Sequence, residues 1–207
     1  MTCAGPTSRV LSLGCGIGDT EILLAPHVEE IIGLDLSPAA IRQARRDAGR
    51  VPNARFIEET LETAHFEPES FDLIIAIFFL HHLSEEELPE LARNVRSLLR
   101  PNGYFYSLDP SRYRLSGAIG SYLIPKMMAQ YQSPGERPLI PEETAKVFAE
   151  TGLETRLSYY DFLSTPLAGL FPSWSGGYRF TRALDDGLVR VPLLKKISSN
   201  FEILGRR

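Results

Sequence analysis

The sequence predicts an α/β domain with a doubly wound, mostly parallel sheet. Strand and helix signals alternate at short spacing through the first half of the chain, and a glycine-rich segment, 14–18, directly follows the first apolar run. The 207 residues are 43% hydrophobic and 23% charged, which is typical of a globular protein. Because a chain of this length can bury a large core, we expect one domain over residues 1–207.

The first half is expected to contribute most of the sheet. Its strands are expected at 10–13, 31–34, 55–57, 71–78 and 104–108. The near-continuous apolar run at 71–78 is typical of a strand buried on both faces. Helices are expected between the strands at 19–25, 38–48 and 84–99. The helix signals are Ser37 before a proline, the capping-box spacing of Ser84 and Glu87, and the Pro-Asn-Gly stop at 101–103.

The regular alternation fails after Asp109. The later elements are expected as a helix at 142–150, a strand at 153–162 and a closing strand at 200–204. Two segments rich in aromatic, proline and glycine residues are expected to be insertions outside the sheet, an inserted helix plus loop at 111–140 and a second segment at 164–198. The core of the domain is therefore expected at 8–110, 141–163 and 199–207.

Composition excludes several classes of function. The chain has 22 Lys and Arg against 26 Asp and Glu, so nucleic acid is not expected as a partner. Cys3 and Cys15 lack CxxC spacing, so we expect neither a metal site nor a redox dithiol, and we expect a cytoplasmic location. The longest apolar run, 73–80, is far shorter than the roughly 20 residues needed to span a bilayer. The first nine residues do not resemble a secretory signal.

The glycine-rich segment points to a nucleoside ligand. Gly14, Gly16 and Gly18 follow a predicted strand and precede a helix, so the backbone there can approach a ligand without side-chain clashes. Asp35 ends the second strand, where a carboxylate can accept both hydroxyls of a ribose. A dinucleotide fingerprint, G-x-G-x-x-G, would need its third glycine where this chain has Asp19.

The combination of motifs resembles the class I S-adenosylmethionine-dependent methyltransferases. The likeness covers roughly residues 10–109 and rests on the G-x-G-x-G loop, Asp35, the 71–74 strand segment and the Leu-His-His-Leu sequence at 80–83. It implies a seven-stranded sheet whose last strand is antiparallel, and S-adenosylmethionine as the methyl donor. The implied chemistry is direct displacement, which depends on alignment and exclusion of water more than on a fixed catalytic group.

The resemblance also assigns a cofactor site. It implies that the glycine loop, with Cys15 as a small filler, lines the methionine part and that Asp35 binds the ribose. Leu36 would lie beside the adenine, Thr60 and Leu61 would form the third binding segment, and Ile77 and Phe78 would flank the sulfonium. Many relatives carry acidic residues where this chain has Ser12 and Thr60, so contacts to the methionine and adenine parts can differ here. The residues implied are Gly14, Cys15, Gly16, Gly18, Asp35, Leu36, Thr60, Leu61, Ile77 and Phe78.

Three residues are candidates for a catalytic role. His81 and His82 follow the fourth strand, and one of them could act as a general base, or both could simply support the cofactor loop. Asp109 ends the fifth strand and could orient a substrate, although an Asp-Pro pair is also a common strand end.

The acceptor is expected to be a small molecule. The aromatic and apolar residues of 111–140 and 164–198 suggest an apolar acceptor, with a peripheral membrane contact, an auxiliary helical layer or a homodimer face as open readings. The main alternative function is a non-catalytic methyltransferase-like module that binds cofactor or a partner. An NAD(P)-dependent oxidoreductase is disfavoured by the glycine spacing.

Overall fold

The computed structural model describes residues 3–114, 139–164, 167, 173–191 and 194–207, which form a seven-stranded sheet. The strands are β1 (Arg9–Leu13), β2 (Glu30–Leu34), β3 (Ala54–Ile57), β4 (Phe71–Ile77), β5 (Leu99–Pro110), β6 (Glu154–Tyr160) and β7 (Asn200–Arg206). Their order across the sheet is β3-β2-β1-β4-β5-β7-β6. All pairs up to β5 are parallel, whereas β7 runs antiparallel between β5 and β6. The predicted fold class, including the antiparallel last strand, is confirmed.

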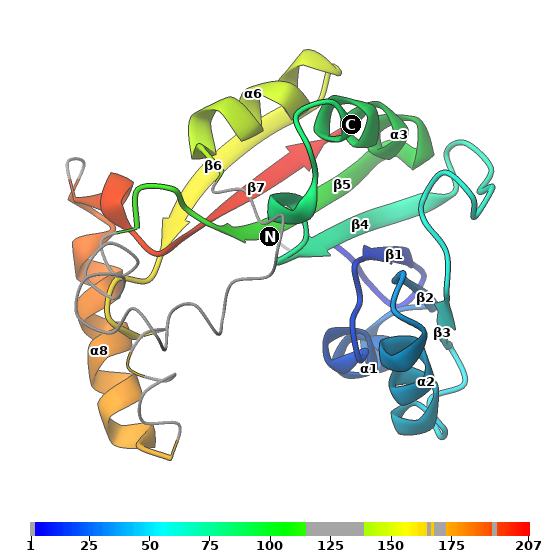
Figure 1. Cartoon of the computed structure of the whole chain (residues 1–207), viewed down its shortest axis with the longest axis horizontal. Helices are drawn as coiled ribbons and strands as arrows, with labels where there is room; N and C mark the ends of the chain where they lie inside the picture. The colour runs from blue at the N-terminus through cyan, green and yellow to red at the C-terminus, as the bar shows by residue number, and fades with distance from the viewer. Residues whose placement is uncertain (1–2, 115–138, 165–166, 168–172, 192–193) are drawn as a thin grey trace.

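Helices cover both faces of the sheet (Figure 1). The helical elements are α1 (Asp19–Leu24), η1 (Ala25–His27), α2 (Pro38–Asp47), η2 (Leu80–His82), α3 (Glu87–Leu98), α6 (Pro141–Glu150), α8 (Ser175–Leu188) and η3 (Lys195–Ile197). α3 and α6 lie over one face, and α1 and α2 pack on the other. Apolar clusters on the two faces match this arrangement, since Leu11 and Ile74 share a core with α3, whereas Val10 and Ile75 belong to a separate cluster.

α3 shows how local signals place an element. Ser84 and Glu87 form the reciprocal capping box, because the Ser84 backbone N–H donates to the Glu87 carboxylate at 2.7 Å and the Glu87 N–H donates to the Ser84 hydroxyl at 3.2 Å. The apolar stripe that follows, including Leu88 and Leu91, is buried against the sheet. The helix is therefore fixed both at its first turn and along its apolar face.

The prediction that Leu99 belongs to this helix is wrong. Leu99 begins β5, where it pairs with Phe71 of β4 and is fully buried. β5 thus runs from Leu99 to Pro110 rather than over 104–108 alone. The strand passes the Pro-Asn-Gly segment with a change of register, in which Asn102 adopts a positive φ of 66°. Pairing with β4 outweighs the local signals that favour a break there.

The C-terminal half of the sheet is built by residues far apart in sequence. β6 is shorter than the predicted 153–162 strand, and β7 extends two residues beyond the predicted 200–204 strand. Phe105 of β5 stacks on Phe148 of α6 at a centroid distance of 4.3 Å, which packs this half of the sheet beneath α6. α8 stands beyond the end of β6 and is not part of the sheet. The helix predicted within 111–140 lies outside the described residues, apart from the few at the ends of that segment.

Candidate functional site

The glycine loop connects β1 to α1 at the carboxyl edge of the parallel strands. Gly14, Gly16 and Gly18 have φ values of 67°, 54° and 84°, a conformation that residues with a side chain rarely adopt. A Cβ at Gly14 would lie 2.4 Å from the Phe79 ring. A Cβ at Gly16 would meet no atom within 4 Å, so the loop has open space above it at this residue.

Three N–H groups of the glycine loop are hydrogen-bonded within the protein. The Cys15 N–H donates to the Leu34 carbonyl at 2.9 Å, and the Gly18 N–H donates to the Cys15 carbonyl at 3.0 Å. The Gly16 N–H donates to Asp35 Oδ2 at 2.9 Å. Because a carboxylate of the protein already takes the Gly16 donor, the loop is poorly suited to hold phosphate groups.

Asp35 ties the end of β2 to the glycine loop. Besides the bond from Gly16, its Oδ1 accepts the Ser37 backbone N–H at 2.8 Å. Each carboxylate oxygen can accept more than one hydrogen bond, so both can still receive a ligand hydroxyl. The arrangement holds the carboxylate in one orientation before any ligand binds.

A cavity of about 690 Å³ opens beside this carboxylate, between the carboxyl ends of the strands and α3. Its lining combines apolar side chains with acidic ones, and none of the described residues that line it is a lysine or arginine. The lining residues are Leu13, Gly14, Leu34, Asp35, Leu36, Glu59, Thr60, Leu61, Glu62, Phe78, Phe79, His82, Leu83, Glu87, Glu90 and Leu91. The cavity therefore suits a ligand with apolar surface and positive charge.

The structure brings together part of the predicted site. The predicted residues that line the cavity are Gly14, Asp35, Leu36, Thr60, Leu61 and Phe78. The predicted residues that do not line it are Cys15, Gly16, Gly18 and Ile77. Sequence reasoning missed Glu59 and Glu62, which flank the Thr60-Leu61 pair. Their only sequence signal is a run of acidic residues after the third strand, which is hard to tell from a solvated surface.

The residue after β4 has an unusual backbone. Phe78 has a φ of 52° and its N–H donates to the Leu108 carbonyl of β5 at 2.7 Å. A positive φ costs roughly 1–3 kcal/mol in a residue with a bulky side chain, and such strain concentrates at ligand sites. The conformation leaves the Phe78 ring 48% exposed at the cavity wall, where it can cover a bound molecule.

The three catalytic candidates meet beside the cavity. Asp109 is fully buried, and its Oδ1 lies 2.9 Å from His81 Nδ1 and accepts the His81 backbone N–H at 3.3 Å. Burial raises the pKa of Asp109, although the hydrogen bonds with His81 act in the opposite direction. The His81 and His82 rings lie 4.1 Å apart between centroids. Only His82 of the three lines the cavity.

Cys15 is unsuited to act as a nucleophile. Burial raises the pKa of its thiol, and the nearby carboxylates of Glu21 and Asp35 raise it further. The thiol therefore stays protonated at neutral pH, whereas a nucleophilic cysteine needs the thiolate. Among the described residues, no group of three or more His, Cys, Asp or Glu side chains is placed to hold a metal ion.

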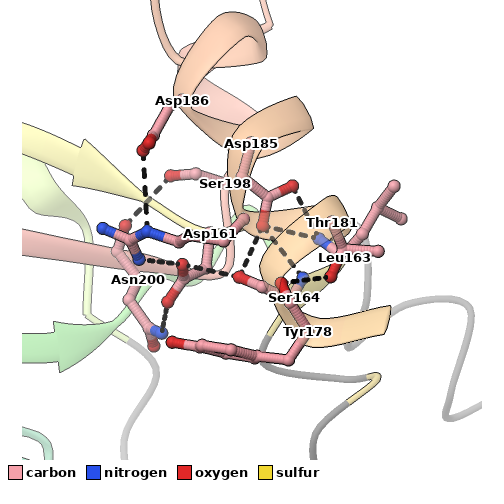
Figure 2. Close-up of polar contacts among 10 residues, drawn as sticks. Asp161, Leu163, Ser164, Tyr178, Thr181, Asp185, Asp186, Ser198 and Asn200 are labelled. Carbon is pink, nitrogen blue, oxygen red and sulfur yellow. Dashed lines mark hydrogen bonds and ion pairs between the residues drawn. The ribbon is translucent and has the colours of Figure 1, made fainter. Parts of the chain in front are cut away.

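A second polar cluster lies where the C-terminal half of α8 meets the segment that follows β6 (Figure 2). The buried Asp185 accepts hydrogen bonds from the backbone N–H groups of Leu163 and Ser164 at 3.1 and 2.9 Å, and from the Ser164 hydroxyl at 2.6 Å. Asp161 lies within 2.8 Å of the Arg182 guanidinium and has a positive φ of 56°. These contacts fasten α8 to the segment that follows β6, so the cluster has a structural explanation.

Comparison with known proteins agrees with the geometry. Residues 10–103 match a methyltransferase domain family. The chain is 34% identical over 103 residues to the uncharacterized methyltransferase YcgJ of Bacillus subtilis, covering 49% of this chain and 40% of that protein. It is 32% identical over 107 residues to the uncharacterized methyltransferase sll0829 of Synechocystis, covering 52% and 49%. The chain thus spans less than half the length of these relatives.

The fold comparison extends beyond the matched segment. The structure of an S-adenosylmethionine-dependent methyltransferase from Mesorhizobium loti superposes with a TM-score of 0.70 and 20% identity, covering 100% of this chain and 94% of that one. In the part of the chain that the structure describes, no helix is long and apolar enough to cross a bilayer. Residues 10–103 therefore match a methyltransferase domain family, and the fold of the chain resembles that of a solved S-adenosylmethionine-dependent methyltransferase.

Proposed function

We propose that this protein binds S-adenosylmethionine in the cavity beside Asp35 and transfers its methyl group to a small, largely apolar acceptor. The observation that carries the proposal is the charge of the cavity, which is lined by Asp35, Glu59, Glu62, Glu87 and Glu90 and by no described lysine or arginine. S-adenosylmethionine carries net positive charge, whereas the pyrophosphate of a nicotinamide dinucleotide is anionic. The same lining would therefore attract the first and repel the second.

The lining residues suggest how the cofactor is held. Asp35 is placed to accept the ribose hydroxyls, as the resemblance implies, and Leu36 and Leu61 offer apolar surface for the adenine. Glu59 lies next to Thr60, and its carboxylate can accept a hydrogen bond from the adenine amino group. Glu59 would then take the role of the acidic residue that position 60 lacks. The glycine loop and the segment Ile77-Phe78 remain the proposed neighbours of the methionine part and the sulfonium.

The chemistry is a direct displacement. When bound, the sulfonium supplies an electrophilic methyl group: an acceptor lone pair forms the new bond to carbon, and the carbon–sulfur bond breaks with its electrons on sulfur. An oxygen or sulfur acceptor must also lose a proton. His82 is the candidate base for this proton, because it lines the cavity. The proposed task of the Asp109–His81 pair is to hold His82 in place, because Asp109 fixes the His81 ring and the two histidine rings are in contact.

The proposed apolar character of the acceptor rests on α8. Trp174, Phe180 and Leu184 on and before this helix are 59%, 66% and 43% exposed. α8 stands at the carboxyl edge of the sheet, where ligands of open α/β folds bind (Figure 1). This supports an acceptor that covers apolar surface when it binds.

Calorimetric titration with S-adenosylhomocysteine tests the cofactor assignment without an acceptor. We expect binding with a one-to-one stoichiometry, and Asp35→Ala should weaken it by about 1.5–3 kcal/mol, the range for hydrogen bonds to charged groups. Asp47→Ala in α2 is the matched control, because Asp47 is exposed and bonds to Gln43 of its own helix. Unchanged affinity in Asp35→Ala, or binding of NADH in place of the nucleoside, would contradict the assignment.

Methyl transfer from labelled S-adenosylmethionine to a panel of small apolar phenols, thiols and amines tests turnover. With an acceptor that must lose a proton, His82→Gln should lower kcat by roughly 10²- to 10⁴-fold and leave the affinity for S-adenosylhomocysteine unchanged. Binding of the cofactor without any transfer would favour the alternative of a non-catalytic module. A kcat for His82→Gln close to that of the native protein would exclude His82 as the base.

A further inference from the structure

Glu21 is a buried carboxylate that none of the roles above uses. It lies in α1, the helix that begins directly after the glycine loop, and it is only 2% exposed. None of the described residues forms a hydrogen bond with its Oε2. A buried carboxylate oxygen without a donor is strongly unfavourable, and few native groups of this kind lack a purpose.

The charged groups that act on Glu21 are themselves carboxylates, so no positive charge among them offsets its own. Burial raises its pKa, the Ser12 hydroxyl bonded to it opposes that rise, and the carboxylates of Asp19 and Asp35 raise the pKa further. The same carboxylate also raises the pKa of Cys15 in the glycine loop. Glu21 lies in the first turn of α1, directly after Gly18 of the loop, in a region where the protein supplies negative charge.

The space beside Asp35 is open, although Glu21 itself is not among the residues that line the cavity. The cavity reaches Gly14 and Asp35, and a Cβ added to the next glycine, Gly16, would have no atom within 4 Å. The N–H groups of Cys15, Gly16 and Gly18 are already bonded within the protein. A ligand group that enters here meets the Asp35 carboxylate, and the group that a carboxylate favours is a cationic hydrogen-bond donor.

We infer that Glu21 binds the α-ammonium group of the methionine part of the cofactor. This inference rests on the proposed function and deepens it, because it assigns the amino-acid end of the ligand. Ser12 is 3% exposed and touches this carboxylate, and position 12 is where the resemblance leads one to expect an acidic residue. Glu21 thus supplies from α1 the charge that β1 lacks in this chain.

The inference predicts selectivity among adenosine thioethers. S-adenosylhomocysteine carries the ammonium group, whereas 5′-methylthioadenosine has the same adenosine and sulfur but no amino acid part. Glu21→Gln keeps the shape of the side chain and removes its charge. This substitution should lower the affinity for S-adenosylhomocysteine at least 10-fold and change the affinity for 5′-methylthioadenosine less than twofold.

Two further variants sharpen the test. Asp19→Asn removes an exposed carboxylate from the same turn and should change either affinity less than threefold. Ser12→Asp combined with Glu21→Gln returns a carboxylate to the same spot from β1 and should recover most of the lost affinity for S-adenosylhomocysteine. Calorimetry at pH 5.5 in buffers of different ionisation enthalpy should show proton release on binding in the native protein and not in Glu21→Gln.

The outcomes separate this inference from the proposed function. If the native protein binds neither nucleoside, the proposed function fails and this inference fails with it. If it binds both, and Glu21→Gln weakens neither or weakens both equally in a folded variant, the cofactor assignment stands and the role of Glu21 is wrong. Loss confined to S-adenosylhomocysteine, with recovery in the double variant, supports the inference.

Discussion

Two buried carboxyl groups near the candidate site, Glu21 and Asp109, ionise less readily in the folded protein than in water. Glu21 and Asp109 are both buried, and burial raises the pKa of each. Each also has one carboxylate oxygen without a hydrogen-bond partner among the described residues. Groups kept under such conditions commonly serve binding or catalysis at the expense of stability.

The pH dependence of stability tests this for Glu21. Because its pKa is raised in the folded state, its contribution to stability is fully present below the unfolded pKa, near 4.3, and is lost as the pH rises through the folded value. The neutral Glu21→Gln should therefore be more stable than the native protein at pH 8, by about 1–3 kcal/mol, and the difference should shrink towards pH 4. Thermal unfolding of the ligand-free proteins across this range measures it.

The same stability measurement can contradict the prediction for Glu21→Gln. Asp19→Asn, whose side chain is exposed, is the control and should differ little from the native protein at either pH. A Glu21→Gln variant that is less stable than the native protein at pH 8 would show that the ionised carboxylate has a stabilising partner. In that case it would not be a group waiting for a cation.

Among the elements, α8 depends on polar contacts more than on packing. Within α8 only Gly177 and Asp185 are buried, so the helix contributes few side chains to a core. Its attachment runs through Asp185 to Leu163 and Ser164, as Figure 2 shows. An element held in this way can detach while the sheet stays folded.

Asp185→Ala should release α8. The substitution leaves buried donors of the 163–164 segment without acceptors, at a cost of about 1–3 kcal/mol. We expect faster hydrogen exchange over α8 with little change in the strands, and unchanged binding of S-adenosylhomocysteine. Asp186→Ala removes only an exposed pair with Arg182 and is the control. Exchange in α8 that matches the native rate in Asp185→Ala would show that packing, and not this cluster, holds the helix.

At the scale of the whole molecule, local patterns were enough to predict the sheet and the region of the site. Alternating strands and helices, the glycine loop and the capping box each depend on neighbours in sequence, so they can be read from it. The extent of β5 could not, because the pairing of Leu99 with Phe71 overrides a proline and a glycine. The contact between His81 and Asp109, 28 residues apart, depends on the register of β4 against β5.

The acidic residues of the candidate site and the proposed role of Glu21 were the hardest to predict. Glu59 and Glu62 stand in a polar run, where surface charge is the ordinary interpretation. Glu21 falls in a short helix, and nothing in its spacing shows that it faces inward. The place of Glu59 and Glu62 at the cavity and the burial of Glu21 are products of the folded arrangement, and only the structure shows them.

The place of β7 in the sheet has a consequence for biosynthesis. β6 pairs with β7 alone among the described strands, and β7 inserts between β5 and β6 although it is synthesised after both. As the chain leaves the ribosome, β1 to β5 can associate in the order in which they appear. β6 must wait with both edges unpaired until β7 emerges, and β5 exposes one edge for the same interval. Protection of these edges by a chaperone, or slow emergence of β6 from the ribosome, would have its largest effect during that interval.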